Sequence, residues 1–185
     1  MKFLKLFIII FISLTTSIKA DLNEKLLNQL KEGGKLIFIR HAYAPGSGDP
    51  ANFNLDDCSS QRNLNLEGKK QAEKIGEFFR KNNINIYQVF SSEWCRCKDT
   101  AQIAFYKFKT KNFLNSFYSP KYANNKSRQI KELKEFIKNY NNQKNLILVT
   151  HYVLISEVLD YAPSSGEIVV SDKNFNIIGS IKINY

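Results

Sequence analysis

The stretch KLIFIRHAYAPGSGDP, residues 35–50, carries the clearest structural signal in this chain of 185 residues. Four apolar residues, Leu36 to Ile39, stop abruptly at Arg40 and His41, and a loop rich in glycine and proline follows. A short apolar run bounded by such residues is typical of a strand that is covered on both faces. The stretch therefore predicts a buried strand that delivers an arginine and a histidine to its carboxyl end.

Two further segments repeat this pattern along the chain. NLILVT, residues 145–150, ends directly before His151, and INIYQVF, residues 84–90, runs into the sequence SSEWCRC. Helical spacing of apolar residues fills the intervals, and the last segment has the pattern of a hairpin around residues 173–174. Helices are expected over residues 21–34, 65–81, 91–106 and 128–140 and from 152 to about 160, with an irregular stretch over 107–126. Strands that alternate with helices predict an α/β fold, a three-layer α/β/α sandwich with a mainly parallel sheet.

The first twenty residues differ in character from the rest. Lys2 and Lys5 precede an apolar run over residues 6–14, and a short polar stretch then ends at Ala20. This order predicts a signal peptide over residues 1–20 and a single exported domain over residues 21–185, periplasmic or secreted. The alternative is an uncleaved anchor, but the apolar run is short for a spanning helix, which needs ~20 residues. No stable membrane insertion is expected after cleavage.

The chain carries 27 basic and 17 acidic residues, a formal charge of +10, or +7 without the three lysines of the predicted signal peptide. A positive surface favours anionic partners such as phosphate esters, anionic lipid head groups or nucleic acid. No nucleic-acid recognition motif accompanies the charge, so nucleic acid is not expected as a partner. A small phosphorylated substrate is the partner that the site residues below favour.

Three cysteines in an exported chain predict one disulfide and one remaining thiol. Cys95 and Cys97 are too close in sequence to bridge easily, so Cys58 is expected to pair with one or the other. A zinc site is the competing interpretation, but a CxC motif with one distant cysteine lacks the usual ligand spacing.

Both histidines of the chain, His41 and His151, directly follow a predicted strand. If the strands are parallel, their carboxyl ends meet at the edge where open α/β sheets bind ligands. The chain has 22 lysines and only five arginines, and guanidinium groups bind phosphate oxygens in a planar, bidentate way that lysine cannot. Arg40 and Arg96 lie at predicted strand ends or helix starts on this edge, and Arg62 follows the long loop that begins there. One histidine at a strand end is usually structural, but the convergence of all these groups predicts an anion site.

Four segments in this order, LIFIRHA, QRNLNLEGKKQA, SSEWCRCKDTA and LVTH, resemble the histidine phosphatase superfamily with its phosphoglycerate-mutase-like fold. The long loop, the WCRC turn and the SGEIVV segment are similar to a small exported bacterial branch that includes lipopolysaccharide core heptose phosphatases. The resemblance implies that His41 is the nucleophile and carries a transient phosphohistidine. It also implies that Arg40, Arg96 and Arg62 bind the phosphoryl oxygens, that His151 donates a hydrogen bond to them, and that no metal or other cofactor is needed.

The chain departs from the family pattern in its proton donor. Residues 105–131, where many members carry an acidic residue, contain no Asp or Glu but seven basic and seven aromatic residues, which predicts a wall or lid over the site or, alternatively, a plain solvated loop. Glu93 and Asp57 are the candidate donors from other segments, with Asp99 a further choice. Alternatively, the leaving group needs no proton, or activity is weak. The expected function is a phosphomonoester phosphatase, with an envelope sugar phosphate as a candidate substrate, and the competing one is a phosphate-binding module without turnover.

Overall fold

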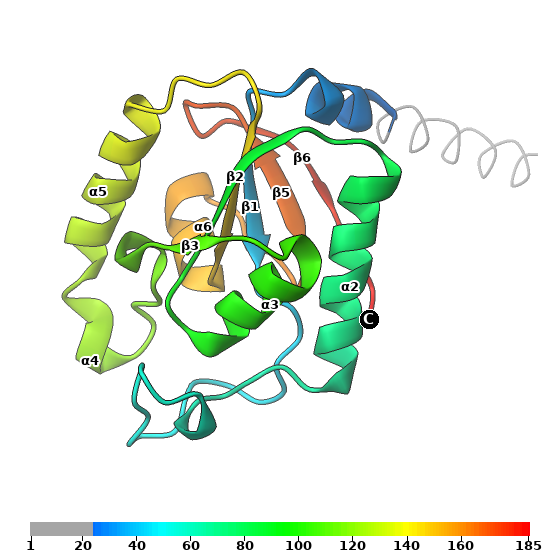
Figure 1. Ribbon diagram of the computed structural model, residues 1–185. Helices are drawn as coiled ribbons and strands as arrows, with labels where there is room; N and C mark the ends of the chain where they lie inside the picture. Colours follow the sequence, from blue (N-terminus) through cyan, green and yellow to red (C-terminus); the bar gives the residue numbers. More distant parts are fainter. Residues whose placement is uncertain (1–23) are drawn as a thin grey trace, which may run out of the picture.

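The computed structural model describes residues 24–185, so the predicted signal peptide lies outside the described part. A six-stranded sheet with the order β3-β2-β4-β1-β5-β6 forms its centre (Figure 1). The strands are β1 (Leu36–Arg40), β2 (Ile86–Ser91), β3 (Lys109–Thr110), β4 (Asn145–Thr150), β5 (Ile168–Ser171) and β6 (Ile177–Ile181). The first four are mutually parallel, whereas β5 runs antiparallel to both β1 and β6. The predicted parallel sheet and terminal hairpin are confirmed.

Helices cover both faces of the sheet, as the three-layer prediction requires. They are residues 24–32, α2 (Leu66–Lys81), α3 (Cys95–Phe105), α4 (Pro120–Ala123), α5 (Lys126–Lys138), α6 (Tyr152–Leu159) and the 3₁₀ turns η1 (Cys58–Ser60) and η2 (Asn112–Leu114). The helix at residues 24–32, α2 and α3 pack on one face, and α5, α6 and η2 pack on the other (Figure 1). Among residues 24–185, none of the helices combines the length and apolar character needed to cross a bilayer.

The two apolar cores follow from the alternation of side chains along the buried strands. In β1, Ile37 and Ile39 enter the core beneath α2 and α3, and Leu36 and Phe38 enter the core beneath α5 and α6. Because successive side chains of a strand point to opposite faces, a strand that is buried on both faces must be apolar throughout. This alternation explains why LIFI and LILV are continuous apolar runs.

Local signals locate α2 well and α3 less well. Asn65 caps α2 as predicted, and its side chain accepts a hydrogen bond from the Gly68 N–H (3.0 Å). α3 begins at Cys95 rather than at the predicted position near residue 91, because the Ser92 N–H continues the sheet and donates to Val149 O (2.9 Å). The stretch over residues 107–126, predicted to be irregular, contains β3, η2 and α4.

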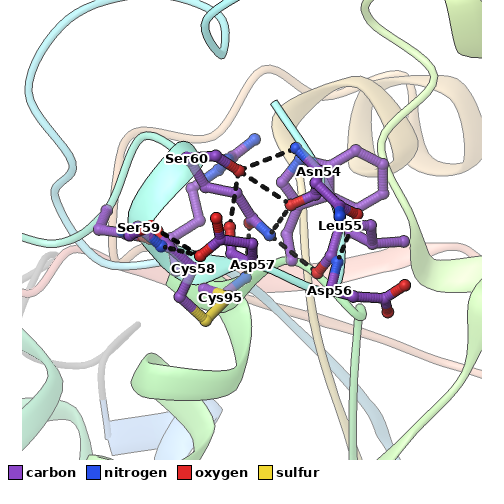
Figure 2. Close-up of a disulfide and its surroundings, with 12 residues drawn as sticks. Asn54, Leu55, Asp56, Asp57, Cys58, Ser59, Ser60 and Cys95 are labelled. Carbon is purple, nitrogen blue, oxygen red and sulfur yellow. Dashed lines mark hydrogen bonds between the residues drawn. A yellow bond between two sulfur atoms is a disulfide. The ribbon is translucent and has the colours of Figure 1, made fainter. Parts of the chain in front are cut away.

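The long loop between β1 and α2 is fastened to α3 by a disulfide. Cys58 pairs with Cys95, one of the two predicted pairings, and Cys97 is a buried free thiol. Figure 2 shows that residues 54–60 of this loop are also bonded to one another beside the disulfide: the Ser60 hydroxyl accepts from the Asn54 N–H (2.8 Å) and donates to Asp57 O (2.7 Å). The loop is therefore a structured element that lies against the beginning of α3.

Candidate active site

Three parallel strands bring their end residues together at one edge of the sheet. His41 follows β1, Ser92 follows β2 and His151 follows β4. The His41 N–H donates to Thr150 O (2.9 Å), and the ring centroids of His41 and His151 are 5.5 Å apart. Residues that are separated by 110 positions thus meet where the sequence predicted, because parallel strands end at the same edge.

The imidazole of His41 is held in one tautomer. Its Nδ1 lies 2.8 Å from the backbone oxygen of Ala42, which can only accept, so Nδ1 carries the proton and Nε2 has a free lone pair. Burial first, and then the positive charge of Arg96, lower the pKa of His41 well below its usual value. His41 is therefore neutral at physiological pH and offers Nε2 as a nucleophile.

A chain of hydrogen bonds fixes His151 in the opposite tautomer. The Asn115 side-chain oxygen accepts from the Glu93 N–H (2.8 Å) and from the Ser92 hydroxyl (3.0 Å). Because the Ser92 hydroxyl has only one proton, the Nε2 of His151, 2.8 Å from the Ser92 oxygen, is the donor in that pair. Burial first, and then Arg96, lower the pKa of His151 well below its usual value, so this ring is also neutral. Its single N–H is engaged by Ser92, so in this tautomer His151 does not supply the hydrogen bond to a phosphoryl oxygen that the resemblance implies.

The three predicted arginines line one cavity with the two histidines. Arg40 donates from Nη1 to Pro163 O (2.9 Å), while its buried Nε has no partner within residues 24–185. Arg62 instead donates hydrogen bonds to the backbone of the loop between β1 and α2: its Nε donates to Gly48 O (2.8 Å) and its Nη1 to Ala44 O. Buried N–H groups without partners are rare, and the two side-chain examples within residues 24–185, the Nε of Arg40 and the Nε of Arg96, belong to arginines that line this cavity.

Asp49, which the sequence analysis did not single out, pairs with Arg96 in the cavity wall. Its carboxylate accepts from Arg96 Nη1 (2.7 Å) and Nη2 (3.2 Å), from the Arg62 backbone N–H (3.1 Å) and from the Trp94 indole (3.0 Å). Burial would raise the pKa of Asp49, but the hydrogen bonds and charge of Arg96 outweigh it and lower the pKa. The available signal was its place as the single acidic residue of residues 41–55, directly after the strand that carries His41.

Aromatic and basic side chains form the remaining wall of the cavity, whose volume is about 400 Å³. Part of this wall comes from Ser116 and residues 118–122, within the acid-free segment that was predicted to cover the site. The aromatic lining residues are Phe53, Trp94, Tyr118, Tyr122 and Tyr152, and Lys121 adds a positive charge. The cavity therefore has room for an organic group beside a phosphate.

The two candidate proton donors do not line the cavity. Asp57 is exposed in the loop, where its carboxylate accepts from the N–H (2.9 Å) and hydroxyl (2.7 Å) of Ser59 (Figure 2). The Glu93 carboxylate accepts a hydrogen bond from the Asn115 amide, and it so orients the Asn115 side chain whose oxygen begins the hydrogen-bond chain to His151. The structure thus brings together both histidines and all three arginines, and it leaves Glu93 and Asp57 outside.

No group of three or more His, Cys, Asp or Glu side chains within residues 24–185 is arranged to hold a metal ion. Cys58 and Cys95 are joined to each other, which excludes both from a zinc site in this state. The positive charge of the cavity comes from the three guanidinium groups and from Lys121.

Comparison with known proteins identifies relatives of this fold. Residues 36–114 match the model of the histidine phosphatase superfamily (branch 1), and no curated protein matches the chain. The protein histidine phosphatase SixA complexed with tungstate has a TM-score of 0.53 at 13% identity, over 77% of this chain and 92% of that chain. A phosphoglycerate mutase from Thermus thermophilus has a TM-score of 0.53 at 16% identity, over 81% of this chain and 99% of that chain. A mycobacterial glucosyl-3-phosphoglycerate phosphatase solved with vanadate has a TM-score of 0.55 at 14% identity, over 75% of this chain and 92% of that chain. The fold is therefore phosphoglycerate-mutase-like.

Proposed function

We propose that this chain, whose residues 36–114 match the model of the histidine phosphatase superfamily, is a member of that superfamily and hydrolyses a phosphomonoester through a phosphohistidine at Nε2 of His41. The observation that carries the proposal is the state of His41. It is neutral, its Nδ1–H is bound to Ala42 O, and its ring lines a cavity with three arginines. An imidazole nitrogen with a free lone pair beside cations that can bind phosphoryl oxygens meets the requirements for in-line attack on phosphorus.

The reaction takes place in two steps at this nitrogen. Nε2 of His41 attacks phosphorus and forms a P–N bond while the bond from phosphorus to the leaving oxygen breaks. The leaving oxygen takes a proton from solvent and departs as an alcohol. Water then attacks the phosphohistidine, the P–N bond breaks and returns its electron pair to Nε2, and the attacking water gives one proton to solvent as inorganic phosphate leaves. Arg40 and Arg96 are proposed to stabilise the charge on the phosphoryl oxygens as it shifts, with Arg62 contributing charge from the loop.

The lining of the cavity supports a substrate that is larger than phosphate. Aromatic faces such as Tyr118 and Tyr152 favour a ring that stacks on them, and Lys121 favours a second anionic group. Relatives of the same fold include a phosphatase for a glucosyl phosphoglycerate and one for protein phosphohistidine, each solved with a phosphate-like oxyanion. We infer a phosphorylated sugar as the substrate class, in line with the resemblance to heptose phosphatases of the bacterial envelope.

The disulfide supports export of the protein. Disulfides persist in oxidising compartments such as the periplasm, and Cys58–Cys95 connects two segments of the active-site wall. Together with the predicted signal peptide, it favours a periplasmic or secreted enzyme.

A second candidate function is a phosphate-binding module without turnover. The supporting observation is that the one carboxylate lining the cavity, within the described part of the chain, is occupied by Arg96 and not free to protonate a leaving group. Such a module would bind phosphate or vanadate in the same cavity and would form no covalent intermediate.

The deciding experiment is rapid-quench labelling of wild type and His41→Gln with radiolabelled acetyl phosphate. Label on the wild type alone, stable to base and lost in acid, is the expected result. Hydrolysis of p-nitrophenyl phosphate should persist in a chelator and vanish in His41→Gln. Label at equal levels on both proteins would refute His41 as the nucleophile, and vanadate binding without any label would favour the binding module.

A further inference from the structure

The Asp49–Arg96 pair is the most enclosed ion pair in the described part of the chain. The side chains of Arg96 and Asp49 are only 4% and 9% exposed, whereas the other ion pairs each have a side chain that is at least a third exposed. The pair lies in the wall of the cavity that holds both histidines. An ion pair at that position, beside the proposed phosphoryl site, needs an explanation in terms of the site.

Asp49 and the backbone oxygen of Arg62 occupy only part of the N–H groups of Arg96. A guanidinium group has five N–H bonds. Nη1 donates to Asp49 Oδ1 (2.7 Å) and to the backbone oxygen of Arg62 (3.3 Å), and Nη2 donates to Asp49 Oδ2 (3.2 Å). Nε is buried and has no partner within residues 24–185. The Nε–H and one N–H of Nη2 therefore remain unused.

These two remaining N–H groups lie on the same edge of the planar guanidinium. A carboxylate on the Nη1/Nη2 end leaves the Nε/Nη2 edge free, and that edge has the parallel donor geometry that binds two oxygens of one phosphate. Arg96 lines the same cavity as His41 and His151, and among the charged groups it does most to lower the pKa of both rings. A phosphoryl group attacked by His41 would accept from this edge.

We propose that Asp49 is a positioning residue, which holds the end of the Arg96 guanidinium so that its Nε/Nη2 edge faces the phosphoryl group. This inference rests on the proposed function, because it assumes that a phosphoryl group binds beside His41. The backbone N–H of Arg62 and the Trp94 indole fix Asp49 in turn, through contacts of 3.1 and 3.0 Å. Asp49 acts through Arg96 and does not itself transfer a proton.

Two other roles for Asp49 make different predictions. A general acid would protonate the leaving group, so its loss would harm alkyl phosphates far more than aryl phosphates, whose leaving groups are stable anions. If the Asp49 carboxylate instead competed with phosphate for Arg96, its removal would strengthen the binding of oxyanions. A positioning residue predicts weaker oxyanion binding and an equal loss for both classes of substrate.

The test compares wild type, Asp49→Asn and the matched control Asp56→Asn, which makes the same change at an exposed aspartate of the same loop. Orthovanadate binding is measured by calorimetry, and kcat/KM is measured with p-nitrophenyl phosphate and with ethyl phosphate. We expect Asp49→Asn to weaken vanadate binding and to lower both kcat/KM values by the same factor, about 10–100-fold, as for other partners that orient a ligating side chain. Asp56→Asn should match the wild type.

A second comparison keeps the test decisive if Asp49→Asn unfolds. The double variant Asp49→Asn/Arg96→Ala lacks both charges of the buried pair, so it leaves no unpaired buried guanidinium. It is compared with the single variant Arg96→Ala. Asp49→Asn should then cause no further loss of kcat/KM in that background, because the two residues act as a unit. A further loss, a selective loss with ethyl phosphate or tighter vanadate binding would each overturn the inference. Failure of the wild type to bind vanadate and to hydrolyse either ester would instead refute the proposed function.

Discussion

The two buried histidines make the stability of the protein depend on pH in a window where few other groups titrate. His41 and His151 are each 3% exposed, and burial followed by the charge of Arg96 lowers the pKa of both rings well below the usual value. In the unfolded chain both rings would titrate near pH ~6.5. Below that pH the unfolded chain binds more protons than the folded protein, so the free energy of unfolding must fall as the pH falls.

The size of the effect follows from linkage. For one ring that stays neutral in the fold and has an unfolded pKa near ~6.5, a change from about pH 7.5 to about pH 5.5 costs roughly 1.3 kcal/mol, and two rings cost roughly 2.7 kcal/mol. Replacing His41 by Gln removes one of the two rings, so the variant should lose only about half as much stability over the same change. Asp49 and Glu167, whose pKa values are lowered, titrate below this window.

Urea unfolding, followed by circular dichroism in buffers free of phosphate, measures the free energy of unfolding of wild type and of His41→Gln at each pH. The comparison between wild type and His41→Gln cancels the other groups, including Asp99, whose pKa burial raises. We expect the wild type to lose more stability than the variant by roughly 1.3 kcal/mol. Equal losses in the two proteins would refute the argument, because they would mean that the His41 ring titrates in the fold as it does in the unfolded chain.

Two further predictions concern the cysteines. Cys58 and Cys95 are 37 residues apart, for which the chain-entropy model gives about 4 kcal/mol of stabilisation; reduction should lower the free energy of unfolding by about this amount in urea titrations, in wild type and in Cys97→Ala alike, and an unchanged midpoint would contradict it. Burial raises the pKa of the Cys97 thiol to about 12, so iodoacetamide at mildly alkaline pH should label Cys97 only after unfolding; mass spectrometry that detects rapid labelling of the native protein would show that the thiol is accessible.

The elements that could be predicted from the sequence are those with strong local signals. β1 and β4 are buried on both faces, so LIFIR and NLILVT are apolar without interruption and have only one reasonable structure. α2 was located to the residue at its start, because Asn65 supplies the capping oxygen directly. The meeting of His41 and His151 was also predictable, since strand direction alone places both at one edge.

The elements that could not be predicted depend on contacts between distant segments. α3 starts late because the backbone of Ser92 and Glu93 bonds to Val149 and Asn115 instead of entering the helix. The role of Glu93 was obscured for the same reason: nothing local shows that its carboxylate meets the Asn115 amide, 22 residues away. Glu93, a candidate proton donor, therefore does not line the cavity.

Asp49 was overlooked because its contact with Arg96 depends on how the loop between β1 and α2 packs against α3. An aspartate after glycine and before proline is ordinary turn chemistry, and the contact with Arg96, 47 residues away, forms only once the loop lies on α3. Several linkages hold it there: the Cys58–Cys95 disulfide, the Cys95 N–H donating to Gln61 Oε1 (3.0 Å), and the Arg62 guanidinium on Gly48 O.

These linkages all converge on the residues next to Arg96. Cys95 precedes Arg96 directly, so the disulfide anchors the loop within one residue of the guanidinium that Asp49 holds. Sheet packing positions His41 and His151, whereas the loop and the start of α3 position Arg62, Asp49 and Arg96 as a separate unit. Since phosphoryl transfer relies on the alignment of cations with the phosphoryl oxygens, the geometry of the site depends as much on this disulfide-linked loop as on the strands that carry the histidines.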